Sequence, residues 1–339
     1  MYRSTKKKKK GNQLPPPPTL TGSFRLIQKL GRRKNKNRQT NPIECNLQGL
    51  LIEDEGAIAL INALMGNNVQ ATILDLSMCG LTNTAAIKIA EFLFHDKVCH
   101  TLCLQGNQIE DEGGAAIAKS LMTNCTITSL RFEDNRLGAG AGHAFGQALR
   151  KNSTAFREFN FLANPFGSEG ISPIFMGMSS NRSRILSVHL RRCDIDSLGC
   201  IILADALRTN ETITSIDLQS NLICDEGAAA LASALKNDNR TLRVLDLRNN
   251  LISTAMYSLE EMISTNRSIR LLQVEGNDFA GDWEDLTKRL TRQMDFNEIG
   301  YWKIVEKEMK EERERIAAEM EAEIARKIEQ DLLENALKK

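Results

Sequence analysis

The amino-acid sequence predicts an α/β solenoid: a curved stack of about nine strand–helix repeats of 28–29 residues, with a parallel concave sheet, convex helices and a long C-terminal helix. A short apolar motif recurs at a constant period, and amphipathic segments rich in small residues follow it. One such unit cannot bury its apolar side alone, so neighbouring repeats have to stack. The 339 residues suffice for one elongated repeat domain with an extension at each end.

The repeated motif reads apolar-x-apolar-x-x-Asn/Cys-x-apolar, as in Leu102, Leu104, Asn107 and Ile109. Its alternating start predicts a short strand with one face inward. The Asn or Cys is expected to turn inward and hydrogen-bond neighbouring backbone, forming a ladder along the stack. The ladder positions are Cys79, Asn107, Asn135, Asn164, Cys193, Asn221, Asn250 and Asn277. Their separations of 28, 28, 29, 29, 28, 29 and 27 residues are too regular for chance.

A degenerate copy precedes these, because residues 47–56 parallel residues 104–113 with Leu50 in the ladder position. A weakened terminal copy is typical of a capping repeat. The second half of each repeat is expected to be an amphipathic helix, as at residues 113–121 and 227–235, and residues 282–290 are predicted to form the closing helix of a C-terminal cap.

The repeat length, the full helix and the Cys/Asn ladder resemble the leucine-rich-repeat superfamily, specifically its ribonuclease-inhibitor-like class, over about residues 43–294. The resemblance implies a horseshoe that binds other proteins. Relatives in this class include ribonuclease inhibitor, the Ran GTPase-activating proteins, the repeat arms of NOD-like receptors, the end domain of tropomodulins and a repeat subunit of the ciliary dynein regulatory complex. Function varies widely on such a fold, so the resemblance alone does not select one.

The charge distribution divides the chain into a basic arm (1–41), the solenoid with its caps (42–294) and a charged C-terminal helix (295–339). Residues 1–43 contain thirteen Lys and Arg and no acidic residue, whereas the remainder carries 31 basic against 43 acidic residues, a net charge of −12. A basic arm on an acidic body indicates an electrostatic role for the arm.

The arm contains a proline run at 15–18 and two basic clusters. Its electrostatic residues are Lys6, Lys7, Lys8, Lys9, Lys10, Arg32, Arg33 and Lys34. They suit an acidic surface such as tubulin tails, nucleic acid or anionic lipid. The arm lacks interleaved aromatic residues, which disfavours specific nucleic-acid binding. A solvated disordered tail and a nuclear-import signal remain the alternatives.

The C-terminal segment from Tyr301 to Leu337 has no Gly or Pro and predicts one continuous helix about 50 Å long. Its apolar residues recur every four positions, at Ile316, Met320, Ile324, Ile328 and Leu332. A four-residue repeat drifts around the surface of a straight helix and differs from the seven-residue repeat of a coiled coil. We therefore expect a helix docked on a partner or a solvated charged helix rather than a self-sufficient coiled coil.

Composition and motifs exclude several kinds of site. No run of 18 apolar residues and no export signal is present, which predicts reduced thiols and a cytoplasmic, cytoskeletal or nuclear protein that is not secreted and spans no membrane. His95, Cys99, His100 and Cys103 are close in sequence, but their side chains would have to converge from different faces to bind zinc. The six Asn-x-Ser/Thr sequons recur at the helix-to-strand junction, which makes them a product of the repeat. We expect no enzyme, small-molecule substrate, metal or cofactor, because nucleophile, phosphate-binding and metalloprotease motifs are missing.

The outward strand positions form the candidate partner-binding ridge of the concave face. They are Arg131, Glu133, Asn160, Leu162, His189, Arg191, Arg192, Asp217, Asp246 and Arg248. Mixed charges around an exposed Leu162 suit a protein surface better than a nucleic-acid backbone, which favours a single sign of charge. The alternative is that this face is an ordinary solvent-exposed polar surface that binds no partner.

These features together favour a non-enzymatic scaffold that binds proteins through its concave face and C-terminal helix, and acidic surfaces through its arm. Among such roles we expect a structural subunit of a large cytoskeletal assembly, with the cilium as a specific setting. The alternative is a regulator of a small GTPase, similar to the Ran-activating relatives. Those proteins carry a strongly acidic tail, whereas residues 295–339 mix 13 acidic with 9 basic residues.

Overall fold

The computed structural model describes residues 42–66, 69–151, 157–179, 184–279, 288 and 292, in which nine strands alternate with eight named helices. The strands are β1 (Ile43–Asn46), β2 (Ala71–Asp75), β3 (Thr101–Cys103), β4 (Ser129–Arg131), β5 (Glu158–Asn160), β6 (Ser187–His189), β7 (Ser215–Asp217), β8 (Val244–Asp246) and β9 (Leu271–Gln273). The helices are α2 (Glu53–Gly66), α3 (Asn83–His95), α4 (Asp111–Leu121), α5 (Ala139–Lys151), α6 (Gly167–Met178), α7 (Ser197–Thr209), α8 (Asp225–Asn237) and α9 (Met256–Thr265).

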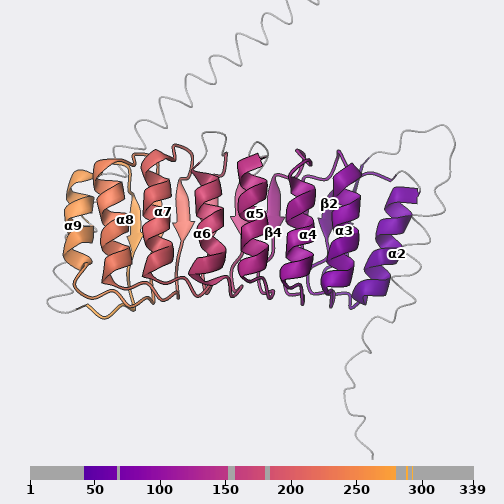
Figure 1. Cartoon of the computed structure of the whole chain (residues 1–339), viewed down its shortest axis with the longest axis horizontal. Helices are drawn as coiled ribbons and strands as arrows, with labels where there is room; N and C mark the ends of the chain where they lie inside the picture. The colour runs from indigo at the N-terminus through magenta and orange to yellow at the C-terminus, as the bar shows by residue number, and fades with distance from the viewer. Residues whose placement is uncertain are drawn as a thin grey trace, which may run out of the picture.

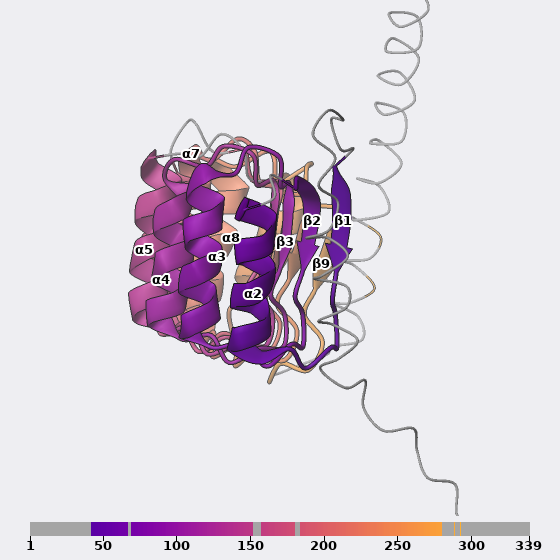
Figure 2. The ribbon, with the colours of Figure 1, turned by 90° about the vertical axis from the view of Figure 1, so that its right-hand side faces the viewer.

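All nine strands pair in sequence order in one parallel sheet, each joined to the next by a helix. Figure 1 shows the helices side by side in a single row in front of the sheet. In the end-on view of Figure 2 the helices form one layer and the strands the other, and α4 and α5 bow outward relative to α2 and α8. The predicted solenoid is therefore confirmed, including the degenerate first copy, whose strand β1 pairs with β2.

The apolar core fills the space between the two layers along the whole stack. The central residue of each strand is buried, and its side chain stacks on the equivalent residue of the next strand, as Leu102 does on Leu130. Midway along the stack the core becomes aromatic, with the rings of Phe145 and Phe161 centred 5.0 Å apart. Helices α5 and α6 approach closely there, because a Cβ on Gly142 would lie 2.0 Å from the Gly170 carbonyl oxygen.

The ladder side chains connect the turns of consecutive repeats. The Asn107 Oδ1 accepts the backbone N–H groups of Cys79 (3.1 Å) and Leu81 (3.0 Å), while its Nδ2 donates to the carbonyls of Leu76 (3.0 Å) and Leu104 (2.8 Å). Asn135, Asn164, Asn221, Asn250 and Asn277 make related bonds.

Cysteine occupies the same slot in two repeats with a smaller hydrogen-bonding capacity. The Cys79 and Cys193 thiols each donate to a carbonyl of the preceding repeat at 3.2 Å, on Leu47 and Phe161 respectively. Burial raises the pKa of Cys79 to about 11 and of Cys193 to about 12, so both remain neutral thiols at neutral pH. All eight cysteines lie in the described residues, and all are free thiols.

A further ladder runs along the corner where each helix meets the next strand. Its members are Asn124, Asn210, Asn239 and Asn266, all buried. The Asn239 Oδ1 accepts the N–H groups of Thr241 (3.1 Å) and Leu242 (2.9 Å), and its Nδ2 donates to the carbonyls of Leu207 (2.9 Å) and Asn210 (3.0 Å).

These four asparagines are the first residues of sequons, and their burial explains why the sequon recurs with the repeat. The backbone at these positions is not left-handed, because Asn210 and Asn266 have φ of −80° and −74°. The position requires a buried amide rather than a special backbone angle. The other two sequons, at Asn152 and Asn181, fall outside the described residues.

A polar side chain near the start of one helix also caps the N-terminus of the next helix in the stack. Such side chains are Asp54, Asn83, Asp111, Ser168, Ser197 and Asp225. Asp225 accepts the N–H groups of Ser253 (2.7 Å), Thr254 (3.1 Å) and Ala255 (2.9 Å). Desolvation raises the pKa of Asp225, but these hydrogen bonds outweigh it and lower the pKa to about 2.

We expect Asn239→Ala to lower the free energy of unfolding by at least about 3 kcal/mol, because each of several buried backbone groups left without a partner costs about 1–3 kcal/mol. Chemical denaturation measures this loss. The control is Asn237→Ala at the exposed end of α8, where a change within about 0.5 kcal/mol is expected. Equal effects of the two substitutions would show that the corner asparagines do not hold the repeats together.

Asp225→Asn should flatten the pH dependence of stability in acid. The folded pKa of Asp225 is depressed from 3.8 to about 2, so its contribution is present above about pH 4 and is lost as pH falls through 2. The wild-type chain should therefore be more stable than the variant at pH 6, and the difference should shrink by pH 2. Thermal melts of both proteins across this range measure it, and a constant difference would contradict the capping role.

Candidate protein-interaction surface

The register of the sheet places three rows of side chains on the concave face. The central residue of each strand points into the core, so its neighbours on either side point outward. The first row is Glu44, Ile73, Thr101, Ser129, Glu158, Ser187, Ser215, Val244 and Leu271. The second row is Asn46, Asp75, Cys103, Arg131, Asn160, His189, Asp217, Asp246 and Gln273. The third row follows two residues later, at Gln48, Ser77, Gln105, Glu133, Leu162, Arg191, Gln219, Arg248 and Glu275.

The predicted ridge occupies the second and third rows, together with Arg192, which lies in the following turn with φ of 57°. The sequence reasoning missed the first row, and with it Glu158. The alternation of side chains along a strand could have predicted Glu158 as an outward residue, because it lies two residues before Asn160 on the same strand.

Two ridge residues expected to point outward are in fact buried between their neighbours. Glu133 is 8% exposed and Asp246 is 5% exposed, while Leu162 is only half-buried. Parallel strands lie about 4.8 Å apart, and inward curvature brings their outward side chains closer together. Burial on this face therefore depends on residues one repeat away.

Among the described residues, Glu133 is the ridge carboxylate that has a buried oxygen without a hydrogen-bond donor. Its Oε1 accepts a hydrogen bond of 2.6 Å from Asn160 Nδ2, whereas its Oε2 is buried without a partner among the described residues. Desolvation raises the pKa of Glu133, opposed by its own backbone N–H and by Arg131, and reinforced by the negative charge of Glu158. A buried acceptor without a donor is costly to maintain, and in native structures it calls for an explanation.

His189 lies on the adjoining strand and connects to the missed first row. Its Nε2 is 2.9 Å from Ser187 Oγ and 3.9 Å from Glu158 Oε1. Within the described part of the chain, this 3.9 Å approach is the one side-chain contact of Glu158 with a basic residue.

Arg191 and Arg248 occupy the same row but differ in their bonding. Arg248 Nε lies 3.0 Å from both carboxylate oxygens of Asp246, so this pair is satisfied within one repeat. The Arg191 Nε is buried with no hydrogen-bond partner in the described part of the chain. Glu133 and Arg191 thus flank Leu162 in the third row, each with an unsatisfied polar atom.

The other predicted sites lie elsewhere. The electrostatic arm and the C-terminal helix fall outside the described residues, as does most of the predicted cap. Within the described residues no group of three or more His, Cys, Asp or Glu is placed to hold a metal, and no helix is long and apolar enough to cross a membrane.

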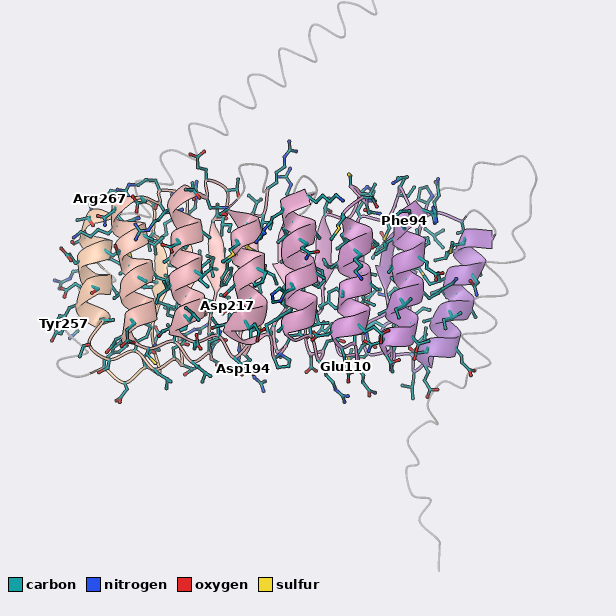
Figure 3. All side chains as sticks on the ribbon, in the orientation of Figure 1. Phe94, Glu110, Asp194, Asp217, Tyr257 and Arg267 are labelled. Carbon is teal, nitrogen blue, oxygen red and sulfur yellow. The ribbon has the colours of Figure 1, made fainter. Side chains whose placement is uncertain are left out.

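Two hollows of about 350 and 400 Å³ share Met65 and His95 at the helix C-terminal edge. Figure 3 shows that edge with Phe94 and Arg267, opposite the edge that carries Glu110 and Asp194. The hollows therefore belong to the helix layer and are separate from the concave face.

A protein-family model described as Leucine Rich repeat matches residues 72–90, 100–118 and 209–232. The chain is 26% identical over 253 residues to human NACHT, LRR and PYD domains-containing protein 5, covering 74% of this chain and 21% of that protein. It is 26% identical over 223 residues to mouse ribonuclease inhibitor, covering 64% of this chain and 49% of that protein. Among solved structures, the leiomodin-1 actin-binding site 2 aligns with a TM-score of 0.43 at 19% identity, over 49% of this chain and 94% of that chain.

The repeats are therefore leucine-rich repeats in a solenoid, and the similarity to ribonuclease inhibitor agrees with the predicted class. The chain spans about a fifth of the first of these relatives and about half of the second.

Glu133→Gln tests whether the negative charge of the buried Glu133 carboxylate lowers the free energy of unfolding. The folded pKa of Glu133 is raised, so the ionised form is disfavoured in the folded chain and stability rises as pH falls through that pKa. The variant keeps the acceptor for Asn160 and removes the charge. Its free energy of unfolding at pH 7 should equal or exceed that of the wild type, within about 1 kcal/mol.

Denaturation curves at pH 7 and pH 4 measure this effect, with Glu112→Gln on the exposed surface of α4 as the control. The advantage of Glu133→Gln should disappear towards pH 4. A substantially destabilised variant at pH 7 would mean that the Glu133 charge stabilises the fold.

Proposed function

We propose that this chain is a non-enzymatic scaffold whose concave face binds a protein partner around Leu162. The observation that carries the proposal is the pair of unsatisfied buried atoms, Glu133 Oε2 and Arg191 Nε, on either side of this half-buried side chain. A partner that donates to Glu133, accepts from Arg191 and covers Leu162 would recover the cost of both atoms.

The charges of the ridge support a protein as the partner. Acidic Glu133 and Asp217 alternate with basic Arg131 and Arg191. A nucleic-acid backbone would favour a single positive sign. Alternating signs instead fix the register and the specificity of a protein interface.

Within this role we propose a structural subunit of a large cytoskeletal assembly in the cytoplasm, with the cilium as its specific setting. The basic arm would bind an acidic surface such as tubulin tails, and residues 295–339 would dock on a neighbouring subunit. Separate contacts of modest strength give high combined affinity when they act together. The supporting observation is the polarity of the chain, a net charge of −12 beyond residue 43 against thirteen basic residues before it.

The test is cross-linking affinity purification from the native source with the full chain, a chain lacking residues 1–41, Leu162→Glu and Leu198→Glu. The deletion ends before β1, whose Ile43 N–H bonds to the Gln70 carbonyl. Leu198 is a matched control, because it is 59% exposed on α7 in the helix layer. We expect Leu162→Glu to remove a protein partner that Leu198→Glu retains, and loss of the arm to weaken co-purification of tubulin several-fold.

Equal recovery of every partner by the two leucine variants would exclude the concave face as the binding surface. A small GTPase as the main partner, with GTP hydrolysis stimulated by the full chain, would favour the regulator instead. A hydrolysis assay with no stimulation would exclude that alternative.

A further inference from the structure

The concave face is acidic over the half of the sheet that begins at β1. Glu44 lies on β1, Asp75 on β2, Glu133 in the turn after β4 and Glu158 on β5. Arg131 is the basic residue among them. The buried thiol of Cys103 lies in their midst. Its pKa is raised to about 11, first by burial and then by Asp75, with Glu133 and Glu158 adding to the effect and Arg131 opposing it. We call these four carboxylates the acidic patch.

The acidic patch lacks a matching set of cations. No Lys or Arg of the described residues lies within ion-pair distance of its four carboxylates, and Glu158 has only the 3.9 Å contact with His189. Glu133 Oε2 has no donor at all among the described residues. The other half of the face differs, because Asp246 is paired with Arg248.

The chain enters the fold at the edge of this acidic half. Ile43, the first residue of β1, donates to the Gln70 carbonyl at 2.9 Å, and its own carbonyl accepts from Thr72 Oγ1 at 3.3 Å. Figure 2 shows β1 at the end of the sheet, beside β2. Residues 32–38 precede it with the sequence Arg-Arg-Lys-Asn-Lys-Asn-Arg, five cations and no anion.

The distances allow this segment to reach the whole acidic patch. Strands β1 and β5 are four spacings apart, about 19 Å at about 4.8 Å per spacing. Ile43 is fixed in β1, so the seven residue steps from Lys36 to Ile43 span up to about 25 Å when extended. The cations from Arg32 to Lys36 are therefore within reach of every strand of the patch, and Arg38, five steps from Ile43, reaches its nearer strands.

We propose that the basic segment 32–38 of this chain docks in cis on the acidic patch, crossing β1 and placing a cation near Glu133 and Glu158. The short connection to β1 gives the segment a millimolar effective concentration at the patch, which favours it over the same segment of another molecule. The contact is electrostatic and partly exposed, so it weakens as salt shortens the Debye length.

This docking has a consequence for the scaffold, and that consequence rests on the proposed function. A docked segment covers part of the concave face beside Leu162 and at the same time holds part of the basic arm away from other acidic surfaces.

Zero-length carbodiimide cross-linking of the full chain tests the docking, with peptides identified by mass spectrometry. The reporter is the bond between Lys34 or Lys36 and Asp75. At 50 mM salt we expect this product within one molecule, and at 500 mM salt at least a fivefold loss. Glu133→Gln combined with Glu158→Gln should reduce it about as much, although Asp75 itself is unchanged.

Two matched controls keep the result specific. Asp217→Asn with Glu275→Gln removes two charges from the other half of the same face, and neutralising Lys6–Lys10 to Gln removes charge from the arm outside the segment. Both should leave the reporter product within twofold of the full chain, and a thermal melt checks that each variant is folded.

The proposal is overturned if the reporter product is absent at 50 mM salt or is unchanged in the Glu133/Glu158 variant. Formation between isotopically distinct molecules in a mixed sample would also overturn docking in cis. Because this measurement uses the isolated chain without a partner, its failure leaves the scaffold proposal standing.

Discussion

Buried amide side chains that bond the backbone of the neighbouring repeat are the interaction on which this structure depends. Most strands are three residues long, and each turn leaves polar backbone groups that the strand ladder cannot satisfy. Asn107 satisfies four such groups across two repeats, and Asn239 does the same at the opposite corner. A repeat is therefore complete only when its neighbour is present, which is why stability in such a stack is a sum of nearest-neighbour interfaces.

This dependence determines which parts of the surface can vary. The inward strand residue, the ladder amide, the corner amide and the helix cap each bind or pack against a neighbouring repeat. The side chains at the outward strand positions are not required for packing between repeats, so their charge and size can differ from one repeat to the next. The concave face changes along the stack for this reason, from the acidic patch through Leu162 and Arg191 to the satisfied Asp246–Arg248 pair.

The sequence predicted the features that repeat and missed those that depend on curvature. The 28–29-residue period gave the number of strands, and a degenerate motif around Leu50 gave the first of them. The corner asparagines were visible as sequons, but their role needed the burial that only packing reveals. Glu133 contacts Asn160, which is 27 residues away in the sequence, and no local pattern records its burial. The first concave row with Glu158 was missed for a simpler reason: only one of the two outward positions flanking the strand centre was considered.

In a repeat protein, a polar residue whose hydrogen bonding differs from that of the equivalent positions in other repeats points to a role outside the packing of the stack. Where a polar side chain follows the common pattern, the neighbouring repeat supplies its partner, as the backbone N–H groups of Cys79 and Leu81 do for Asn107. Glu133 and Arg191 depart from the pattern within two repeats of each other, and each retains an unsatisfied buried atom. Packing alone would favour a shorter or apolar residue at either position, since an orphaned polar group costs stability without return. A contact from outside the solenoid that donates to Glu133 and accepts from Arg191 would satisfy both atoms, which is why these two irregular positions carry the proposed interface.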